Sequence, residues 1–340
     1  MPDFSSELSA SPSLYAQKYD SGRDAILFVR MTPEDYRAAS FLDDRMLLPG
    51  TQGIWAPHAQ VEAALATAAG RPLHYIFHTG HVGSTLLSRL IDETGTVLGL
   101  REPLPLRTLA ELGDMVGNSA ERERQLAARL ATFLKLWRRG FAETRSVVLK
   151  ATSSAGRLAP RLLTAAPAAQ AVYLNLRAEP YLATLLGGAN AITDLRGFEQ
   201  ERSNRVRTAL GDDTWRSTSL GELAAMSWLA ESLTRQTAVE QFEARVLPLD
   251  FDQMLSDLPT AFARILRHLD IEAPPGLAAA IARSPILTRY SKAPKEFAYS
   301  PAMRAQLLAQ ARRENFHEIR RGLQFLERLG ARHAKVAALL

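Results

Sequence analysis

The chain has 340 residues, of which 46% are apolar and 23% charged, and it contains no cysteine. Disulfides, thiolate metal sites and cysteine nucleophiles are therefore excluded. The 41 basic and 36 acidic residues, a net charge of +5, are spread along the whole length, unlike a nucleic-acid-binding arm. Apolar runs stop well short of the roughly 20 residues of a spanning helix, and residues 1–20 lack a secretory pattern. We expect a cytoplasmic protein without a membrane span or a nucleic-acid partner.

Three segments are expected along the chain: an N-terminal lead-in (1–70), a core domain (71–284) and a C-terminal loop and helix (285–340). Apolar periodicity and Gly or Pro boundaries predict the individual elements. Strands are predicted at 25–30, 73–78, 97–100, 146–150, 171–177 and 245–251, and helices at 57–69, 84–92, 119–141, 181–186, 220–242, 258–269 and 301–329. The alternation of strand and helix in the core predicts an α/β fold, with a central parallel sheet flanked by helices.

Two further segments bear on partners. Residues 188–218 are polar, have weak periodicity and carry five arginines, namely Arg196, Arg202, Arg205, Arg207 and Arg216. They are interpreted either as a mobile lid for an acidic acceptor or as a solvated, salt-bridged helix, the latter being the more frequent outcome. The long C-terminal helix could supply a packing face, so a homodimer is a possible assembly.

The turn between the first core strand and its helix reads Thr79-Gly-His-Val-Gly-Ser-Thr85. Gly80 and Gly83 let the backbone turn tightly, so that amides of the loop and of the helix N-terminus point at one anion. The hydroxyls of Ser84 and Thr85 can donate to phosphate oxygens. The Walker pattern has four residues between its glycines and then a Lys, whereas only His81 and Val82 separate the glycines here. The loop therefore indicates a phosphate-binding site that differs from the Walker loop of ATP-hydrolysing enzymes.

The segment His81-Val-Gly-Ser-Thr-Leu86 resembles the 5′-phosphosulfate-binding loop of the sulfotransferases that use 3′-phosphoadenosine 5′-phosphosulfate (PAPS). In that family a basic residue precedes the glycine by two positions, and His81 stands where Lys or Arg is usual. The resemblance extends to about Asp270. It implies the P-loop NTPase-like fold of the sulfotransferases, and Gly80, His81, Val82, Gly83, Ser84 and Thr85 as residues that bind the cofactor.

Three strand ends continue the resemblance. Leu98-Gly-Leu-Arg-Glu-Pro103 is similar to the segment in which protein-tyrosine and related bacterial sulfotransferases place a glutamate base, which implies this role for Glu102. Lys150 matches a lysine that sits beside the transferred sulfuryl group in those relatives. Leu174-Asn-Leu-Arg177 resembles the segment whose arginine binds the 3′-phosphate of the nucleotide.

Two parts of the nucleotide site match the family less closely. The family usually has a Ser eight positions after the arginine, where this chain has Leu185, so that Thr184 is the nearest hydroxyl. Lys292 and Lys295 take the place of a basic C-terminal loop that closes over the nucleotide. They match by position and not by motif.

The resemblance implies transfer of a sulfuryl group from PAPS to a hydroxyl-bearing acceptor, with adenosine 3′,5′-bisphosphate as the nucleotide product. Under this hypothesis Glu102 takes the proton of the acceptor, Lys150 stabilises the sulfuryl oxygens and His81 assists the leaving nucleotide. No metal is required. The identity of the acceptor is left open by the sequence, because the segments that would shape its pocket fall outside the motifs.

Other interpretations remain open. The chain could be an ATP-dependent kinase or NTPase of similar architecture, or a non-catalytic nucleotide-binding protein of the same fold. Glu102 could be a surface carboxylate paired with Arg101 or Arg107, Lys150 could extend from its strand end to solvent, and Arg177 could pair with Glu179. The histidines His74, His78 and His81 could suggest a metal site, but no acidic or Cys ligand stands beside them to complete one.

Overall fold

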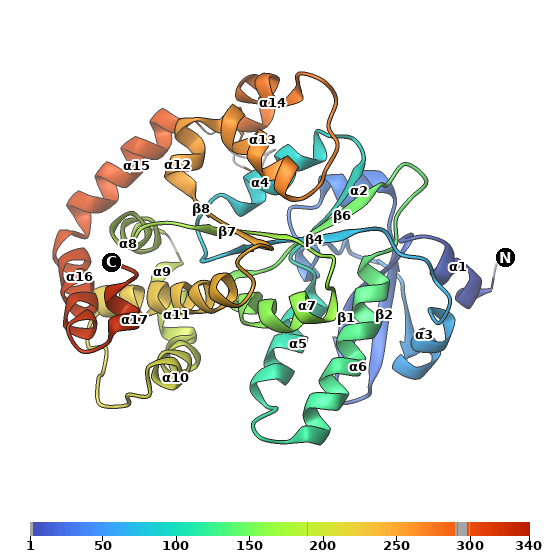
Figure 1. The fold of residues 1–340 in the computed structure, drawn as a ribbon, viewed down its shortest axis with the longest axis horizontal. Coiled ribbons are helices and arrows are strands. Elements are labelled where there is room, and N and C mark those ends of the chain that lie inside the picture. The colour runs from blue at the N-terminus through green and yellow to red at the C-terminus, as the bar shows by residue number, and fades with distance from the viewer. Residues whose placement is uncertain (1–2, 189, 290, 292–297, 299) are drawn as a thin grey trace.

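A five-stranded parallel sheet with the order β5-β6-β4-β7-β8 forms the centre of the molecule (Figure 1). The computed structural model describes all residues except 1–2, 189, 290, 292–297 and 299. The strands are β4 (Leu73–His78), β5 (Val97–Arg101), β6 (Ser146–Lys150), β7 (Ala171–Asn175) and β8 (Val246–Asp250). The predicted α/β class and parallel sheet are confirmed. Successive strands are added first on one side of β4 and then on the other, so the direction of winding switches at β4, where open α/β sheets bind ligands.

Helices cover both faces of this sheet because alternate side chains of each strand point to opposite faces. Ile76 and Val172 belong to a buried cluster with α4 (Ser84–Asp92), and Tyr75 and Phe77 belong to a second cluster on the other face. The first cluster also includes residues of α8 (Ala178–Leu186), α11 (Leu220–Gln241), α12 (Phe251–Ser256) and α13 (Leu258–His268). The second includes residues of α5 (Leu104–Asp114), α6 (Ala120–Trp137) and α7 (Ala159–Ala165). Figure 1 shows α4 and α12–α14 on one side of the sheet and α5–α7 on the other.

The Arg-rich segment 188–218 contains two helices, α9 (Ala191–Gly197) and α10 (Glu199–Leu210), which weak periodicity did not predict. Arg202 pairs with Asp194, and Arg205 pairs with Glu231 of α11, with distances of 2.9 and 2.8 Å between nitrogen and oxygen. The first ion pair thus joins α10 to α9 and the second joins α10 to α11, and such ion pairs leave little trace in apolar periodicity. This arrangement corresponds to the salt-bridged alternative.

The predicted C-terminal helix 301–329 is divided into α15 (Pro301–Glu314) and α16 (Phe316–Gly330), followed by α17 (Ala334–Ala337). The break at Asn315 redirects α16 onto α11. There the two helices approach so closely that a Cβ on Gly221 would lie 1.8 Å from the Glu318 carbonyl oxygen, and one on Gly322 would lie 2.5 Å from the Gly221 carbonyl oxygen. The prediction of one helix over 301–329 was therefore wrong, since docking onto α11 decides the direction of the second half.

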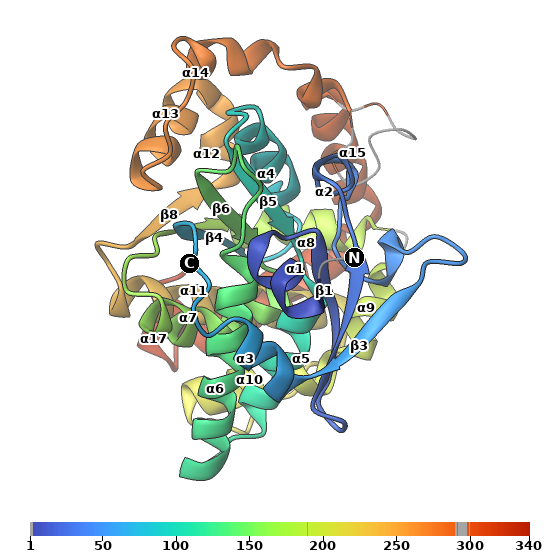
Figure 2. The ribbon, with the colours of Figure 1, turned by 90° about the vertical axis from the view of Figure 1, so that its right-hand side faces the viewer.

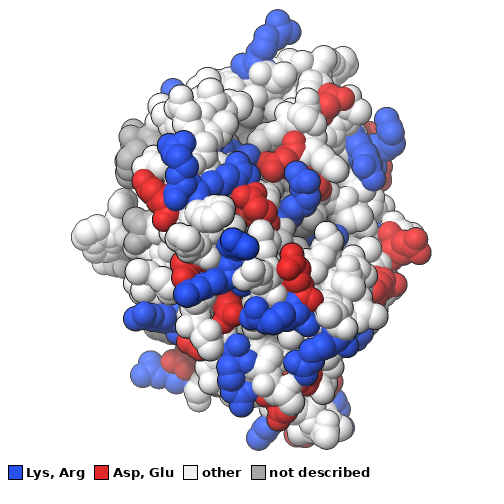
Figure 3. Space-filling view, turned by 90° about the vertical axis from the view of Figure 1, so that its left-hand side faces the viewer, with Lys and Arg blue, Asp and Glu red and all other residues white. Residues whose placement is uncertain are grey.

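The face that carries α15 and α16 shows acidic and basic side chains interspersed (Figure 3). Ion pairs connect these helices to the rest of the molecule: Arg312 to Glu179 at 2.7 Å and Arg328 to Glu222 at 2.7 Å. No helix in the described part of the chain is long and apolar enough to cross a membrane.

Residues 3–64 add a three-stranded antiparallel sheet with the order β1-β2-β3 (Figure 2). Of these strands only β2 was predicted, and the helix predicted at 57–69 is present as the shorter α3. The elements are α1 (Phe4–Ala10), β1 (Leu14–Asp20), β2 (Ala25–Arg30), α2 (Pro33–Ala38), η1 (Asp44–Met46), β3 (Gly53–Pro57) and α3 (His58–Ala64). Buried side chains of this sheet belong to the same cluster as those of α5 and α6. The lead-in therefore shares a hydrophobic core with one face of the parallel sheet.

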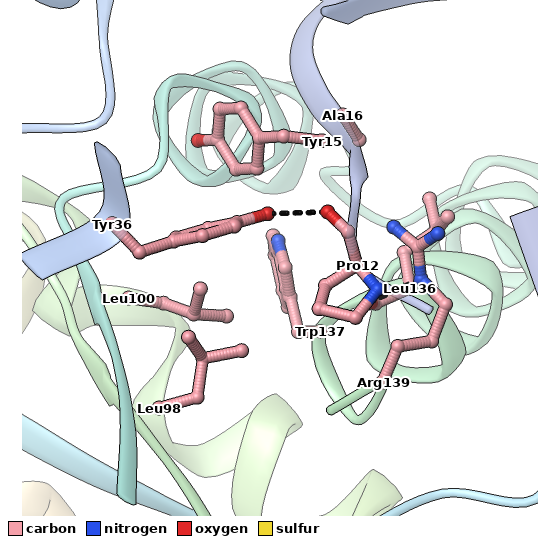
Figure 4. Close-up of a pocket in the computed structure, with 9 residues that line it drawn as sticks. All are labelled: Pro12, Tyr15, Ala16, Tyr36, Leu98, Leu100, Leu136, Trp137 and Arg139. Atoms are coloured by element: carbon pink, nitrogen blue, oxygen red, sulfur yellow. Dashed lines mark hydrogen bonds between the residues drawn. The ribbon is translucent and has the colours of Figure 1, made fainter. Parts of the chain in front are cut away.

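The join between this segment and the core is polar in places (Figure 4). A cavity of about 10 Å³, room for about one water molecule, lies among Pro12, Tyr15, Tyr36, Trp137 and Arg139. The Tyr36 hydroxyl donates to the Pro12 carbonyl at 2.8 Å, and the buried Arg139 guanidinium donates to carbonyls of the N-terminal segment. The lining contains none of the predicted site residues, so this cavity belongs to the packing of the N-terminal segment.

The remaining short helices connect these elements. They are η2 (Ser153–Leu158) after β6, and α14 (Leu277–Ala280), η3 (Ile281–Arg283) and η4 (Pro285–Thr288) after α13.

A buried histidine in β4 makes stability depend on pH. Burial lowers the pKa of His74 from 6.5 to about 4, and its Nδ1 accepts a hydrogen bond from the Gln170 amide at 3.3 Å. Between these two pKa values the unfolded chain binds a proton that the folded chain excludes, so stability falls as the pH decreases from 6.5 to 4, by up to about 3 kcal/mol.

We expect the His74→Asn variant, whose amide oxygen can accept the same hydrogen bond, to lose this part of the pH dependence in urea unfolding. The matched control is His317→Asn, at an exposed position of α16. An unchanged pH slope in His74→Asn would contradict the prediction.

Candidate active site

The predicted site residues lie at the carboxyl ends of four neighbouring strands. Glu102 follows β5, Lys150 ends β6, the loop 79–83 follows β4, and Arg177 comes two residues after β7. Since the sheet order is β5-β6-β4-β7, the four positions follow one another along one edge. The structure therefore brings together residues that are widely separated in the sequence.

The loop after β4 is held in a left-handed turn. Gly80, His81 and Gly83 have φ values of 94°, 54° and 66°, a region that favours glycine and is strained for histidine. The Gly80 amide donates to His78 Nδ1 at 3.1 Å, which leaves the proton on Nε2, and Nε2 donates to the Ala151 carbonyl at 2.9 Å. His78 thus fixes the start of the loop to the turn that follows Lys150.

Polar groups without partners gather where the loop enters α4. Thr79 and Thr85 are buried, and their hydroxyls have no hydrogen-bond partner among the described residues. The first N–H groups of a helix have no acceptor within the helix, and Gly83, at the N-cap position, offers no side chain to cap α4. These donors at the positive end of a nine-residue helix fit a phosphate or sulfate group.

His81 is exposed at the tip of this loop and contacts an aromatic ring from α8. Its ring lies edge-on to Tyr181, with centroids 6.1 Å apart. The Tyr181 hydroxyl is 3.1 Å from Ser227 Oγ. A Cβ on Gly80 would lie 3.5 Å from the Tyr181 hydroxyl and 3.6 Å from Ser153 Oγ, so both hydroxyls border the loop. Sequence reasoning missed Tyr181 and Ser153; only the hydroxyl-rich run after Lys150 gave a signal for the second.

Glu102 and Lys150 form a buried ion pair in which Lys150 Nζ donates to Glu102 Oε1. The Lys150 side chain is 0% exposed and that of Glu102 is 9% exposed. Burying two charges costs several kcal/mol per ion, which their attraction repays only in part. Because its side chain is fully buried, Lys150 does not reach solvent. A buried ion pair of this kind adds little to the stability of the fold and is typical of functional sites.

The backbone at Glu102 supports the same interpretation. Glu102 has a φ of 53°, which is strained for a residue with a side chain, and its amide donates to the Lys150 carbonyl at 2.7 Å. Arg101, the alternative partner, points elsewhere: its guanidinium bonds to Asp92 and to the carbonyls of Tyr36 and Ala39. Glu102 is thus not a surface carboxylate, although the half-exposed Arg107 lies 3.7 Å from its Oε2.

The predicted nucleotide-binding residues on the other side of the loop are more exposed. Arg177 is exposed at the start of α8. It does not pair with Glu179, whose carboxylate is instead bound by Arg312 through two hydrogen bonds of 2.7 Å. Thr184 lies further along α8, and its hydroxyl donates to the Pro180 carbonyl at 2.7 Å. Lys292 and Lys295 lie outside the described residues.

The histidines of β4 are engaged with the backbone. His74 accepts from Gln170, and His78 bridges Gly80 and Ala151. Across the residues that the structure describes, no group of three or more His, Cys, Asp or Glu side chains is arranged to hold a metal ion.

A substitution at Gly83 tests how closely the loop packs against Phe251. A Cβ at this position would lie 2.1 Å from Phe251 Cε2, and φ is 66°. We expect Gly83→Ala to destabilise the protein through both effects. The matched control is Gly95→Ala, at φ 76° with nothing within 4 Å of the Cβ position. The control should lose about 1–2 kcal/mol from backbone strain, and Gly83→Ala a further 1–3 kcal/mol from overpacking, measured by urea unfolding. Equal losses would contradict the close contact with Phe251.

No protein-family model and no curated protein matches the chain. Solved structures that match it include the mouse sulfotransferase SULT7A1 complexed with PAP (12% identity, TM-score 0.42, covering 82% of this chain and 92% of that one). Others are sulfotransferase STF9 from Mycobacterium avium (13%, 0.41, 76% and 80%) and the sulfotransferase domain from the curacin biosynthetic pathway (12%, 0.39, 76% and 98%).

Proposed function

We propose that the protein transfers a sulfuryl group from PAPS to a hydroxyl-bearing acceptor. The observation that carries the proposal is the buried Glu102–Lys150 pair on the strands next to an anion-binding helix N-terminus. Glu102 can accept a proton, Lys150 is a fixed cation, and the N-terminus of α4 can bind a phosphate-like group. An in-line group transfer requires these three functions close together. The loop has no lysine after Gly83, which disfavours an ATP-dependent kinase or NTPase.

The residues of the site offer groups for both ends of the nucleotide, which supports the proposal. The loop Gly80–Thr85, whose Thr85 hydroxyl has no partner among the described residues, would hold the 5′-phosphosulfate. Arg177 would bind the 3′-phosphate, with Thr184 and the loop that contains Lys292 and Lys295 as further contacts. When bound, the nucleotide supplies the activated sulfuryl group.

The chain's own residues would perform the acid–base and electrostatic work. Glu102 accepts the proton of the acceptor hydroxyl, because its carboxylate lies at the edge of the sheet with Lys150 bonded to Oε1. Lys150 offers positive charge for the oxygens of the transferred group. His81, in the position where the family has a permanent cation, donates to the leaving phosphate when it is protonated.

Ligand-dependent thermal stability tests the choice of nucleotide. We expect adenosine 3′,5′-bisphosphate to raise the melting temperature, since a ligand that binds only the folded state stabilises it by about 2.7 kcal/mol at one hundred times its Kd. ADP with Mg²⁺ should leave the melting temperature unchanged. A shift with ADP and Mg²⁺ alone would favour the kinase alternative. Because Arg177 is proposed to bind the 3′-phosphate, Arg177→Gln should reduce the increase in melting temperature that adenosine 3′,5′-bisphosphate produces.

Turnover tests Glu102 as the base. We expect Glu102→Gln to reduce kcat by about 10²–10⁴ and to retain binding of adenosine 3′,5′-bisphosphate. The control is Glu111→Gln, at an exposed position of α5. Because Glu102→Gln leaves Lys150 buried without its partner charge, the double variant Glu102→Gln with Lys150→Gln serves as a second test of folding. Full turnover by Glu102→Gln would remove Glu102 as the base.

A further inference from the structure

A strap from the N-terminal segment, residues 41–47, lies across the turn that holds Glu102. The Leu42 amide donates to the Arg101 carbonyl at 2.7 Å, and the Leu42 carbonyl accepts from the Leu104 amide at 3.2 Å. Leu42 is therefore bonded to the chain on both sides of Glu102. The buried Tyr15 hydroxyl also donates to the Leu42 carbonyl at 2.8 Å, which ties the strap to β1.

The strap presents charged and aromatic side chains to the ion pair. Arg45 Nη2 lies 4.0 Å from Glu102 Oε2. The Phe41 ring lies under both cations, with its centroid 3.5 Å from Arg45 Cζ and 6.0 Å from Lys150 Nζ. Asp43 holds Arg45 in place, since Arg45 Nε donates to Asp43 Oδ1 at 2.8 Å.

Among the described residues, charged groups from three elements lie around Glu102. Lys150 of β6 faces Oε1, whereas Arg45 of the strap and Arg107 of α5 face Oε2 at 4.0 and 3.7 Å. Asp43 is the second carboxylate of the group and lies within 4 Å of both arginines. Although burial opposes it, the contact with Arg45 lowers the pKa of Asp43. In the described part of the chain three cations thus surround two carboxylates, with one cation facing Glu102 Oε1 and two facing Oε2.

We propose that Arg45 is a positioning residue for Glu102, delivered to the site by the strap. Its guanidinium keeps the Glu102 carboxylate ionised and oriented, with Oε1 toward Lys150 and Oε2 toward Arg45 and Arg107. A cation about 4 Å from a carboxylate favours its ionised form. The Arg45 side chain is 54% exposed, so solvent screens the effect, and Arg107 supplies part of it. This inference rests on the proposed function of Glu102 as the base.

The direct test is a titration of the Glu102 carboxyl by ¹³C NMR in the full chain, assigned by its loss in Glu102→Gln. We expect the pKa of Glu102 to rise by about one unit in Arg45→Gln, and to stay near its wild-type value in Arg45→Lys, which keeps the charge. The control is Arg23→Gln, an exposed arginine of the same N-terminal segment that pairs with Asp20. Equal titration curves in wild type and Arg45→Gln would overturn the inference.

Kinetics provide the second measurement. In Arg45→Gln the acidic limb of the pH profile of kcat/KM should move upward by the same amount, a loss of about tenfold on that limb, while the affinity for adenosine 3′,5′-bisphosphate is unchanged. A large loss of nucleotide affinity or of thermal stability, not rescued by Arg45→Lys, would make Arg45 structural and overturn the inference. If wild type transfers no sulfuryl group to any acceptor, the proposed function fails, whereas the NMR titration still decides the role of Arg45.

Discussion

The register of the parallel sheet is the constraint on which the site depends. Parallel strands end together at one edge, and β4 lies between β6 and β7 in this sheet. The turn after β4 is therefore flanked on one side by Lys150 and Glu102 and on the other by Arg177. A shift of one residue in the pairing of β6 with β4 would turn Lys150 to the opposite face of the sheet, and the pair with Glu102 would be lost.

The electrostatic character of this edge follows from burial. Lys150 is fully enclosed, so its charge needs a partner close by, and Glu102 is turned toward it by a strained backbone conformation. The helix N-terminus beside this edge carries partial positive charge and buried hydroxyls that have no partner among the described residues. A buried ion pair and a set of hydrogen-bond donors for an anion thus lie side by side on neighbouring strands.

The N-terminal segment packs against the core domain and contacts the turn that holds Glu102. Its sheet shares a buried cluster with α5 and α6, and its strap is hydrogen-bonded to both sides of the Glu102 turn. Arg89 of α4 bonds to the carbonyl of Arg37, to Ser40 and to the carbonyl of Ser291, so the N-terminal and C-terminal segments meet on the same helix. The parts of the chain outside the motifs are therefore in contact with the parts that contain the predicted site residues.

Local patterns in the sequence were sufficient for β4, its glycine turn and α4, because a buried strand, two glycines and an amphipathic helix each leave a short-range signature. They also placed Glu102, Lys150 and Arg177 at strand ends. The tertiary structure alone decided that Lys150 is buried against Glu102, that Arg45 lies beside them, and that the C-terminal helix breaks at Asn315. These features depend on contacts between segments that are distant in the chain. Such contacts produce no periodic pattern in the local sequence.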